Sequence, residues 1–262
     1  MSVELVIIGG GNMGAALLGG IIAAGADPAT LAVVEPLASR REQLSEQFPD
    51  VVVGDTVPVC PAAVIAVKPP DVPVAVAAAV ASGATRVLSI AAGVATTTIQ
   101  AAAGADVAVV RAMPNTPALV GQGASAIAGG ASATDDDLAW AERVLGAVGT
   151  VIRVDESDLD AVTALSGSGP AYLFLVAEAL IDAGVAAGLD RAVAEALTTQ
   201  LFVGSAALLA DRGDAAGLRD MVTSPGGTTA AGLHVLEARS VRSAFADAVH
   251  AAVARSKELG AR

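Results

Sequence analysis

The sequence predicts an α/β fold in two parts, an N-terminal Rossmann domain with a doubly wound, mostly parallel sheet and an all-helical domain after it. Three observations lead to this prediction. Short apolar strands alternate with helices through the first half, a glycine-rich turn follows the first strand, and strand signals stop near Asp155. Strands that are apolar on both faces are typical of a parallel sheet covered by helices. We therefore expect one domain over 1–155 and a second over 156–262.

The elements of the first domain follow one another in short steps. Its strands are expected at Leu5–Ile8, Leu31–Val34, Val51–Val53, Ala63–Val67, Arg86–Ile90 and Val107–Val110. Its helices are expected at Ala15–Ala24, Ser39–Gln47 and Val72–Ala81. A further strand–helix–strand piece runs from Ser125 to Val154. Within it, Thr134 is a good N-cap, and three aspartates follow where the helix dipole favours negative charge.

The second half reads as long, apolar helices. They are expected at Pro170–Ala187, Arg191–Arg212, Leu218–Val222, Thr228–Ala238 and Val241–Leu259. Asp190 is expected to cap the second of them. For the first, we expect a loop over Ser166–Pro170, with Pro170 at the first helical position and Ser168 or Gly169 as its cap. About 100 residues cannot bury five such helices alone, so an obligate oligomer is predicted.

Composition and charge exclude several classes of function. The formal net charge is −12 and no basic stripe is present, which argues against nucleic acid and against an anionic membrane surface. Cys60 is the only cysteine, so neither an intrachain disulfide nor a thiolate metal cluster is expected. His234 and His250 lack partners at metal-ligand spacing, and no metal site is predicted. With no signal peptide and every apolar run interrupted, we expect a soluble, cytoplasmic protein.

The turn after the first strand has the spacing of a dinucleotide-binding site. Gly9, Gly11 and Gly14 respectively permit the turn, the approach of a pyrophosphate to the backbone, and close packing of helix on strand. The free amides at the helix start would then hold the phosphates. The motif alone is weak, but here the strand and the helix surround it as the site requires.

Other polar groups end later strands at the same edge of the sheet. Glu35 stands where a carboxylate favours the ribose diol of NAD, whereas Arg40 and Arg41 could clamp the 2′-phosphate of NADP, so the coenzyme stays open on these residues. Lys68 is expected to contact coenzyme or substrate. Asn115, in a loop stiffened by prolines, is expected near the nicotinamide amide.

At this point the chain resembles the pyrroline-5-carboxylate reductase family over essentially its whole length. The matching stretches are Ile8–Gly14, Ala66–Pro69, Ala91–Val94, Arg111–Pro117, Asp160–Tyr172 and Val222–Leu233. The first occurs in many dehydrogenases, and the last two are much more specific. The resemblance implies NAD(P)H-dependent reduction of 1-pyrroline-5-carboxylate to L-proline, with NADP(H) favoured and NAD(H) as the alternative coenzyme. It also implies dimers, often arranged as rings, that assemble through the helical domain.

Two sets of site residues follow from the motifs and the resemblance. The expected dinucleotide-binding residues are Ile8, Gly9, Gly10, Gly11, Asn12, Met13, Glu35, Arg40, Ala66, Val67, Lys68, Pro69, Ala92, Gly93 and Asn115. The expected substrate-binding residues are Ser224, Gly226, Gly227, Thr228 and Thr229, whose backbone amides open a helix and suit a carboxylate. In the family, a threonine matching Thr229 is proposed to meet the imine nitrogen.

Two rival functions remain open. One is a reductase of the same architecture that acts on another small imine or on a carbonyl acid. A hydroxy-acid reductase of that kind would normally carry a catalytic lysine on the long interdomain helix, and Pro170–Ala187 has none. The other is a scaffold that binds the dinucleotide without chemistry, for which coenzyme would bind but never turn over.

Overall fold

The computed structural model describes residues 2–260 and divides them into two compact units. Unit 1 holds the residues up to Pro170 together with those from Ala252 onward, and unit 2 is Ala171–Ala251. The compact units therefore divide later than the domain boundary expected at residue 155. Residues just after that boundary stay with unit 1 because Leu159 packs on the sheet residues Ala126 and Ala128.

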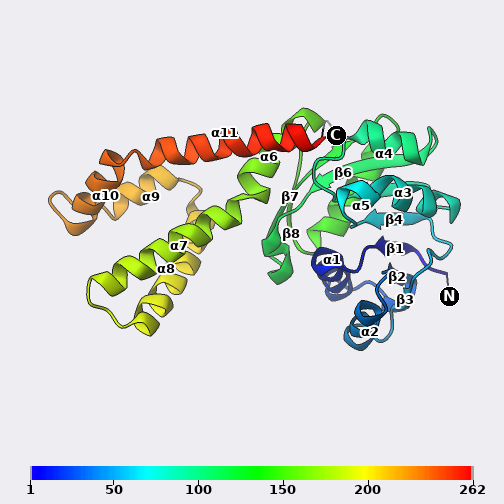
Figure 1. The fold of residues 1–262 in the computed structure, drawn as a ribbon, viewed down its shortest axis with the longest axis horizontal. Coiled ribbons are helices and arrows are strands. Elements are labelled where there is room, and N and C mark those ends of the chain that lie inside the picture. Colours follow the sequence, from blue (N-terminus) through cyan, green and yellow to red (C-terminus); the bar gives the residue numbers. More distant parts are fainter. Residues whose placement is uncertain (1, 261–262) are drawn as a thin grey trace. The chain divides into compact units, whose positions relative to one another are not determined.

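Unit 1 is built on one eight-stranded sheet in the order β3-β2-β1-β4-β5-β6-β7-β8 (Figure 1). The strands are β1 (Leu5–Ile8), β2 (Leu31–Val34), β3 (Val52–Gly54), β4 (Ala62–Ile65), β5 (Arg86–Ser89), β6 (Ala108–Met113), β7 (Gly123–Gly129) and β8 (Gly149–Arg153). The first six are parallel, β7 runs antiparallel to β6, and β8 runs parallel to β7. This confirms the mostly parallel, doubly wound sheet, whose strand order reverses direction between β1 and β4.

Helices cover both faces of the sheet, which is why its central strands are apolar on both sides. The helices of the first face are α1 (Asn12–Ala23), α2 (Ala38–Gln47) and α5 (Asp135–Gly146), and those of the second are α3 (Val72–Ala81) and α4 (Thr96–Ala103). Along β1, Ile7 packs into the first layer and Val6 into the second, because successive side chains point to opposite faces. Short 3₁₀ turns lie at Pro28–Thr30, Pro69–Asp71, Thr116–Val120 and Glu156–Asp158.

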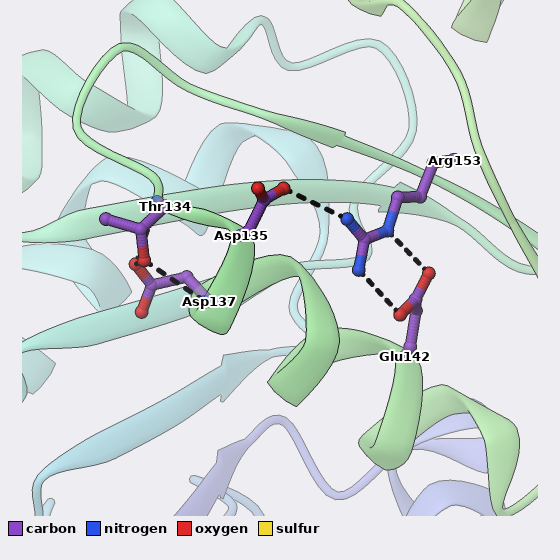
Figure 2. A network of polar contacts seen from close by, with 5 residues as sticks. All are labelled: Thr134, Asp135, Asp137, Glu142 and Arg153. Carbon is purple, nitrogen blue, oxygen red and sulfur yellow. Dashed lines mark hydrogen bonds and ion pairs between the residues drawn. The ribbon is translucent and has the colours of Figure 1, made fainter.

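The start of α5 confirms the expected cap and shows how the helix is fixed to the sheet edge (Figure 2). The Thr134 hydroxyl accepts a hydrogen bond from the Asp137 amide, while an Asp137 carboxylate oxygen accepts one from the Thr134 amide at 3.0 Å. At the end of β8, the Arg153 guanidinium donates to both oxygens of Glu142 and to Asp135. These contacts fasten α5 along β8.

The remaining helices are α6 (Leu159–Val162), α7 (Gly169–Ala186), α8 (Arg191–Arg212), α9 (Ala215–Met221), α10 (Thr228–Ala238) and α11 (Val241–Gly260). The last five agree closely with the expected helices, whereas the short α6 was not expected. Asp190 caps α8 as predicted, because its side chain accepts a hydrogen bond from the Ala192 amide at 2.9 Å.

One expectation about this half is wrong. Ser166–Pro170 is not a capping loop, because Thr163–Gly167 continue α6 as a π-helix that leads into α7. Ser168 has right-handed helical backbone angles, and its amide donates to the carbonyl of Thr163 at 2.8 Å. An N-cap has extended backbone angles instead, so neither the geometry nor the hydrogen bonding of a cap is present.

Unit 2 buries very little within one copy of the chain. Among its described residues only Ala194 and Thr198 are buried, while Leu173, Phe174 and Leu175 of α7 are each more than half exposed. Apolar faces of this size normally mark an interface. By length and composition alone, 156–186 and 191–212 could also cross a membrane, contrary to the expectation that every apolar run is interrupted too soon.

Candidate functional site

The expected dinucleotide-binding segments lie together at the edge of the sheet where the carboxyl ends of the parallel strands meet, which we call the rim. Each segment comes just after a strand: 9–14 after β1, 35 after β2, 66–69 after β4, 91–93 after β5 and 114–115 after β6. These strands are parallel, so their carboxyl ends meet at one edge, and the direction of the strand order reverses between β1 and β4. In open α/β sheets this reversal opens the crevice in which ligands bind.

Three glycines of the first turn are required for three different reasons. Gly9 has a φ of +112°, and a Cβ there would lie 2.4 Å from the Ala66 carbonyl oxygen. A Cβ on Gly14 would lie 2.0 Å from the carbonyl oxygen of Gly9, so only glycine lets α1 pack this closely. Gly11 differs from both, because a Cβ there would meet nothing within 4 Å and its φ is −65°. The protein itself does not require glycine at position 11, but a ligand approaching the backbone would.

The start of α1 can hold an anion. Gly11 is its N-cap and has no side chain to accept the free amides, and the first backbone bond of the helix is that from Ala15 to Gly11, at 2.9 Å. Within residues 2–260, the amides of Asn12 and Met13 have no hydrogen-bond acceptor. Free amides and the helix dipole together form a phosphate site, so these residues fit the pyrophosphate of a dinucleotide.

Glu35 lies at the end of β2 and is engaged with the glycine turn. Its side chain is only 8% exposed, and its two carboxylate oxygens accept hydrogen bonds from the amides of Gly10 and Leu37, each at 3.0 Å. Arg40 completes the arrangement from α2, since its Nε donates to the Gly10 carbonyl at 2.7 Å. A carboxylate is thus held beside the turn, where an adenosine ribose would lie.

The neighbouring Arg41 side chain also makes hydrogen bonds within the protein. Arg41 donates from Nη1 to the carbonyls of Glu35 and Pro36, both at 2.8 Å, and pairs with Asp55 at 3.6 Å. Both arginines therefore stabilise the loop after β2, and part of their hydrogen-bonding capacity is used within the protein.

The segment after β4 lies directly against the glycine turn. The Ala66 amide donates to the Ile8 carbonyl at 2.8 Å, and its own carbonyl is the group that excludes a side chain at Gly9. Val67 is half-buried, while Lys68 and Pro69 are exposed at the rim. The Lys68 ammonium thus remains available to a ligand at this edge.

The loop after β5 is held by a group that sequence reasoning missed. Glu156 accepts hydrogen bonds from the Thr96 amide at 2.6 Å, from the Thr96 hydroxyl, and from Arg111 at 3.0 Å. Burial raises the pKa of Glu156, but the hydrogen bonds and charge of its partners outweigh burial and hold it below the usual value. Because α4 has no cap of its own, this carboxylate caps it and fixes the loop that carries Ala92 and Gly93. Arg111 stood in a quoted motif, whereas nothing near Glu156 in the sequence indicates the contact.

Asn115 lies at the rim after β6, but its carboxamide is already engaged. Oδ1 accepts a hydrogen bond from the Ala124 amide at 2.8 Å, and Nδ2 donates to the Ser166 carbonyl at 3.2 Å. Contact between Asn115 and a nicotinamide amide stays a prediction.

The expected substrate-binding loop belongs to unit 2. Its turn is closed by a 3.0 Å hydrogen bond from the Gly227 amide to the Ser224 carbonyl, and Gly226 has a φ of +69°. A Cβ on Gly227 would lie 2.4 Å from the Ser224 hydroxyl oxygen, so a side chain there would displace that hydroxyl. Gly227 is the N-cap of α10, and the amides of Thr228 and Thr229 have no acceptor in the described chain.

The loop therefore has the chemistry of a small carboxylate site, with free amides, a helix N-terminus and adjacent hydroxyls. Elsewhere, His234 and His250 are exposed, and within residues 2–260 no three His, Cys, Asp or Glu side chains group as metal ligands would. The polar groups suited to chemistry are thus those of the rim and of this loop.

Comparison with known proteins finds matches for both the sheet-containing half and the helical half of the chain. Residues 156–259 match the family model described as pyrroline-5-carboxylate reductase dimerisation, and residues 4–93 match the one described as NADP oxidoreductase coenzyme F420-dependent. A pyrroline-5-carboxylate reductase of Synechocystis is 46% identical over 99% of both chains, and one of Mycobacterium tuberculosis is 44% identical over 98% of this chain and 96% of its own.

Solved structures agree with these matches. The pyrroline-5-carboxylate reductase of Coxiella burnetii superposes with a TM-score of 0.91 at 36% identity over 99% of both chains. The Plasmodium falciparum enzyme, solved with NADP bound, gives 0.84 at 30% identity over 98% of both. With its sheet, its glycine turn and its helical half all matched, the chain belongs to the pyrroline-5-carboxylate reductase family.

Proposed function

We propose that this protein reduces 1-pyrroline-5-carboxylate to L-proline, the last step of proline biosynthesis, with a reduced nicotinamide dinucleotide as the hydride donor. The observation that carries the proposal is identity of 46% over 99% of the chain to a protein of that name. The intact anion sites at the starts of α1 and α10 support it, because substrate and coenzyme are both anionic.

The coenzyme is assigned to the rim of unit 1. Its pyrophosphate would lie on Gly9–Met13, and its ribose beside Glu35 and Arg40. The segments Ala66–Pro69, Ala92–Gly93 and the loop with Asn115 would line the remainder, next to Ile8 at the end of β1. When bound, the dinucleotide supplies hydride. The open space at Gly11 is what makes these residues fit it.

The choice of coenzyme has support on both sides. Family resemblance and the NADP-bound relative favour NADP(H). The carboxylate of Glu35 supports NAD(H), because it would accept a hydrogen bond from a ribose hydroxyl and repel a 2′-phosphate. The ratio of kcat/KM for NADPH and NADH measures which effect dominates.

The substrate carboxylate is assigned to the turn before α10. The Ser224 hydroxyl and the amides of Gly226 and Thr228 would bind it, while the Gly227 amide holds the turn closed on the Ser224 carbonyl. Reduction adds hydride to the ring carbon of the C=N bond and a proton to the nitrogen. Thr229 would place its hydroxyl against that nitrogen. A threonine is a poor acid at neutral pH, so it positions the ring while the proton is already present or arrives through water.

The helical unit is assigned to assembly. The dimerisation model spans α7 and α8, the helices whose apolar side chains are exposed in one copy. A second copy that covers these side chains would account for their composition without a membrane. We propose a soluble, cytoplasmic dimer or ring of dimers that binds neither nucleic acid nor membrane. Unit 2 of one copy would help to complete the site of another.

The test is oxidation of NADPH, and separately of NADH, with 1-pyrroline-5-carboxylate, beside the six-membered imine homologue. Turnover that favours the five-membered ring is expected. Faster turnover of another imine or of a carbonyl acid would favour the related reductase. Coenzyme binding without turnover of any of these would favour the non-catalytic scaffold.

A further inference from the structure

The π-helical turn Thr163–Gly167 contains a backbone acceptor whose α-helical donor is missing from the sequence. In an α-helix, the carbonyl of residue 166 accepts a hydrogen bond from the amide of residue 170. Residue 170 is proline, which has no N–H and whose ring clashes with that carbonyl. The chain answers with the π-helix Thr163–Gly167. A freed carbonyl in a partly buried turn is costly unless another donor reaches it.

Asn115 supplies that donor. Its Nδ2 lies 3.2 Å from the Ser166 carbonyl oxygen and 3.4 Å from the Ser166 hydroxyl, and its Oδ1 accepts from the Ala124 amide at 2.8 Å. The Ala124 N–H can only donate and the Ser166 carbonyl can only accept. The side chain between them must therefore do both, which fixes the orientation of the carboxamide and excludes aspartate or leucine as equivalents.

Met113 and Gly167 also lie close together. A Cβ on Gly167 would lie 2.5 Å from Cε of Met113, the flexible end of the last side chain of β6. The π-turn thus lies against the end of β6 as well as against Asn115. The loop that carries Asn115 follows β6 at the edge assigned to the coenzyme. The turn it holds is followed by α7, the helix with which the chain enters unit 2.

We propose that Asn115 is a positioning residue for the reduction, which acts by replacing the missing Pro170 amide at the Ser166 carbonyl. By holding the π-turn against the rim loop, it fixes the segment from which α7 starts. This inference rests on the proposed function. It assigns the carboxamide to the protein backbone and not to the nicotinamide, and so it separates a role in alignment from a role in coenzyme binding.

If Asn115 replaces the missing Pro170 amide, the effect of a substitution at position 115 on kcat/KM must depend on the residue at position 170. Asn115→Leu removes both hydrogen bonds, and the nearly isosteric Asn115→Asp keeps the acceptor for Ala124 but loses the donor for Ser166. Each should lower kcat/KM for the imine about tenfold or more, because each loses at least the hydrogen bond to the Ser166 carbonyl. The coenzyme Kd should change less than about twofold. Pro170→Ala restores an amide at position 170, so in the double variant the loss caused by Asn115→Leu should shrink to about threefold or less.

Four measurements test the proposal: coenzyme Kd by titration, kcat and KM for the imine, the melting temperature, and hydrogen exchange of the 166–171 backbone. Gln122→Leu, at an exposed amide that makes no side-chain hydrogen bond among the described residues, is the matched control and should resemble the wild type. Faster exchange at 166–171 in Asn115→Asp, with coenzyme Kd retained and partial rescue by Pro170→Ala, would support the inference. The exchange data remain informative even if the wild type fails to reduce the imine. That failure would refute the proposed function but not the contact of Asn115 with the π-turn.

Two results would overturn the inference. One is a coenzyme Kd raised about tenfold by Asn115→Leu and unaffected by Pro170→Ala, which would assign the carboxamide to the nicotinamide. The other is wild-type exchange and wild-type kcat/KM in both Asn115 variants.

Discussion

Gly11 and Gly14 belong to one turn, yet alanine should affect them in opposite ways. At Gly14 the new Cβ would lie 2.0 Å from the Gly9 carbonyl oxygen, and at Gly11 it would meet no atom within 4 Å. Gly14→Ala should therefore damage the fold. Gly11→Ala should leave the fold intact and damage only the binding of a ligand that approaches the backbone.

The magnitudes follow from these contacts. In Gly14→Ala, helix and turn must separate by about 1 Å through backbone atoms, at the upper end of the roughly 1–3 kcal/mol that overpacking costs. At about 2–4 °C per kcal/mol, the melting temperature should fall by about 6–12 °C. In Gly11→Ala, the cost of alanine at an N-cap and the stabilisation from a less flexible unfolded chain nearly cancel, so the free energy of unfolding should change by less than about 0.5 kcal/mol. Loss of one charge-assisted hydrogen bond to the pyrophosphate, about 1.5–3 kcal/mol, should raise the coenzyme Kd roughly ten- to a hundredfold.

The assay compares thermal unfolding without coenzyme with coenzyme titration, for both variants and the wild type. Ala24→Gly, at the C-terminal end of the same helix, is a control for changes in helix stability and should leave the Kd unchanged. Coenzyme affinity equal to that of the wild type in Gly11→Ala would refute the assignment of the pyrophosphate to this turn. A melting temperature of Gly11→Ala as low as that of Gly14→Ala would refute the reasoning from open space.

Three other predictions concern the remaining site groups. Glu156→Gln should lower the free energy of unfolding at pH 7 by about 1–3 kcal/mol, because a charged acceptor is lost. Since the folded-state pKa of Glu156 is lowered, its contribution is complete above its unfolded pKa of about 4.3 and is lost as pH falls through the folded value. Urea unfolding of wild type and variant should therefore converge as pH falls below about 4.3, and a difference that stays constant would contradict this. Thr229→Val should lower kcat about tenfold or more with coenzyme Kd unchanged, whereas Ser224→Ala should mainly raise the KM of the imine. An unchanged kcat of Thr229→Val in steady-state kinetics would contradict the role of the Thr229 hydroxyl in the reduction. Glu35→Ser should shift the ratio of kcat/KM for NADPH over NADH about tenfold toward NADPH, and an unchanged ratio would show that this carboxylate does not select the coenzyme.

Much of the fold was predictable because its signals are local. The strands of the parallel sheet are apolar on both faces, and the turns and caps between elements use residues whose side chains bond within three positions, as Thr134 and Asp190 do. The glycine turn was predictable for the same reason, since its spacing reflects the geometry of a single strand, turn and helix. The loop before α10 was found by its resemblance to a family motif, and the structure adds that Gly226 in it has a φ of +69°, which favours glycine.

What the sequence determined by itself is therefore the order of the elements, the edge of the sheet that carries the rim, and the glycines that a ligand or a close contact requires. Only the tertiary structure decided which residues far away in the sequence the polar side chains bond. Asn115 donates to a carbonyl 51 residues away, to which Pro170 has no amide to donate, and Glu156 caps a helix that begins 60 residues earlier. The physical reason is that a backbone group left without a partner can be satisfied by any donor or acceptor that folding brings near it, and sequence spacing carries no record of that proximity.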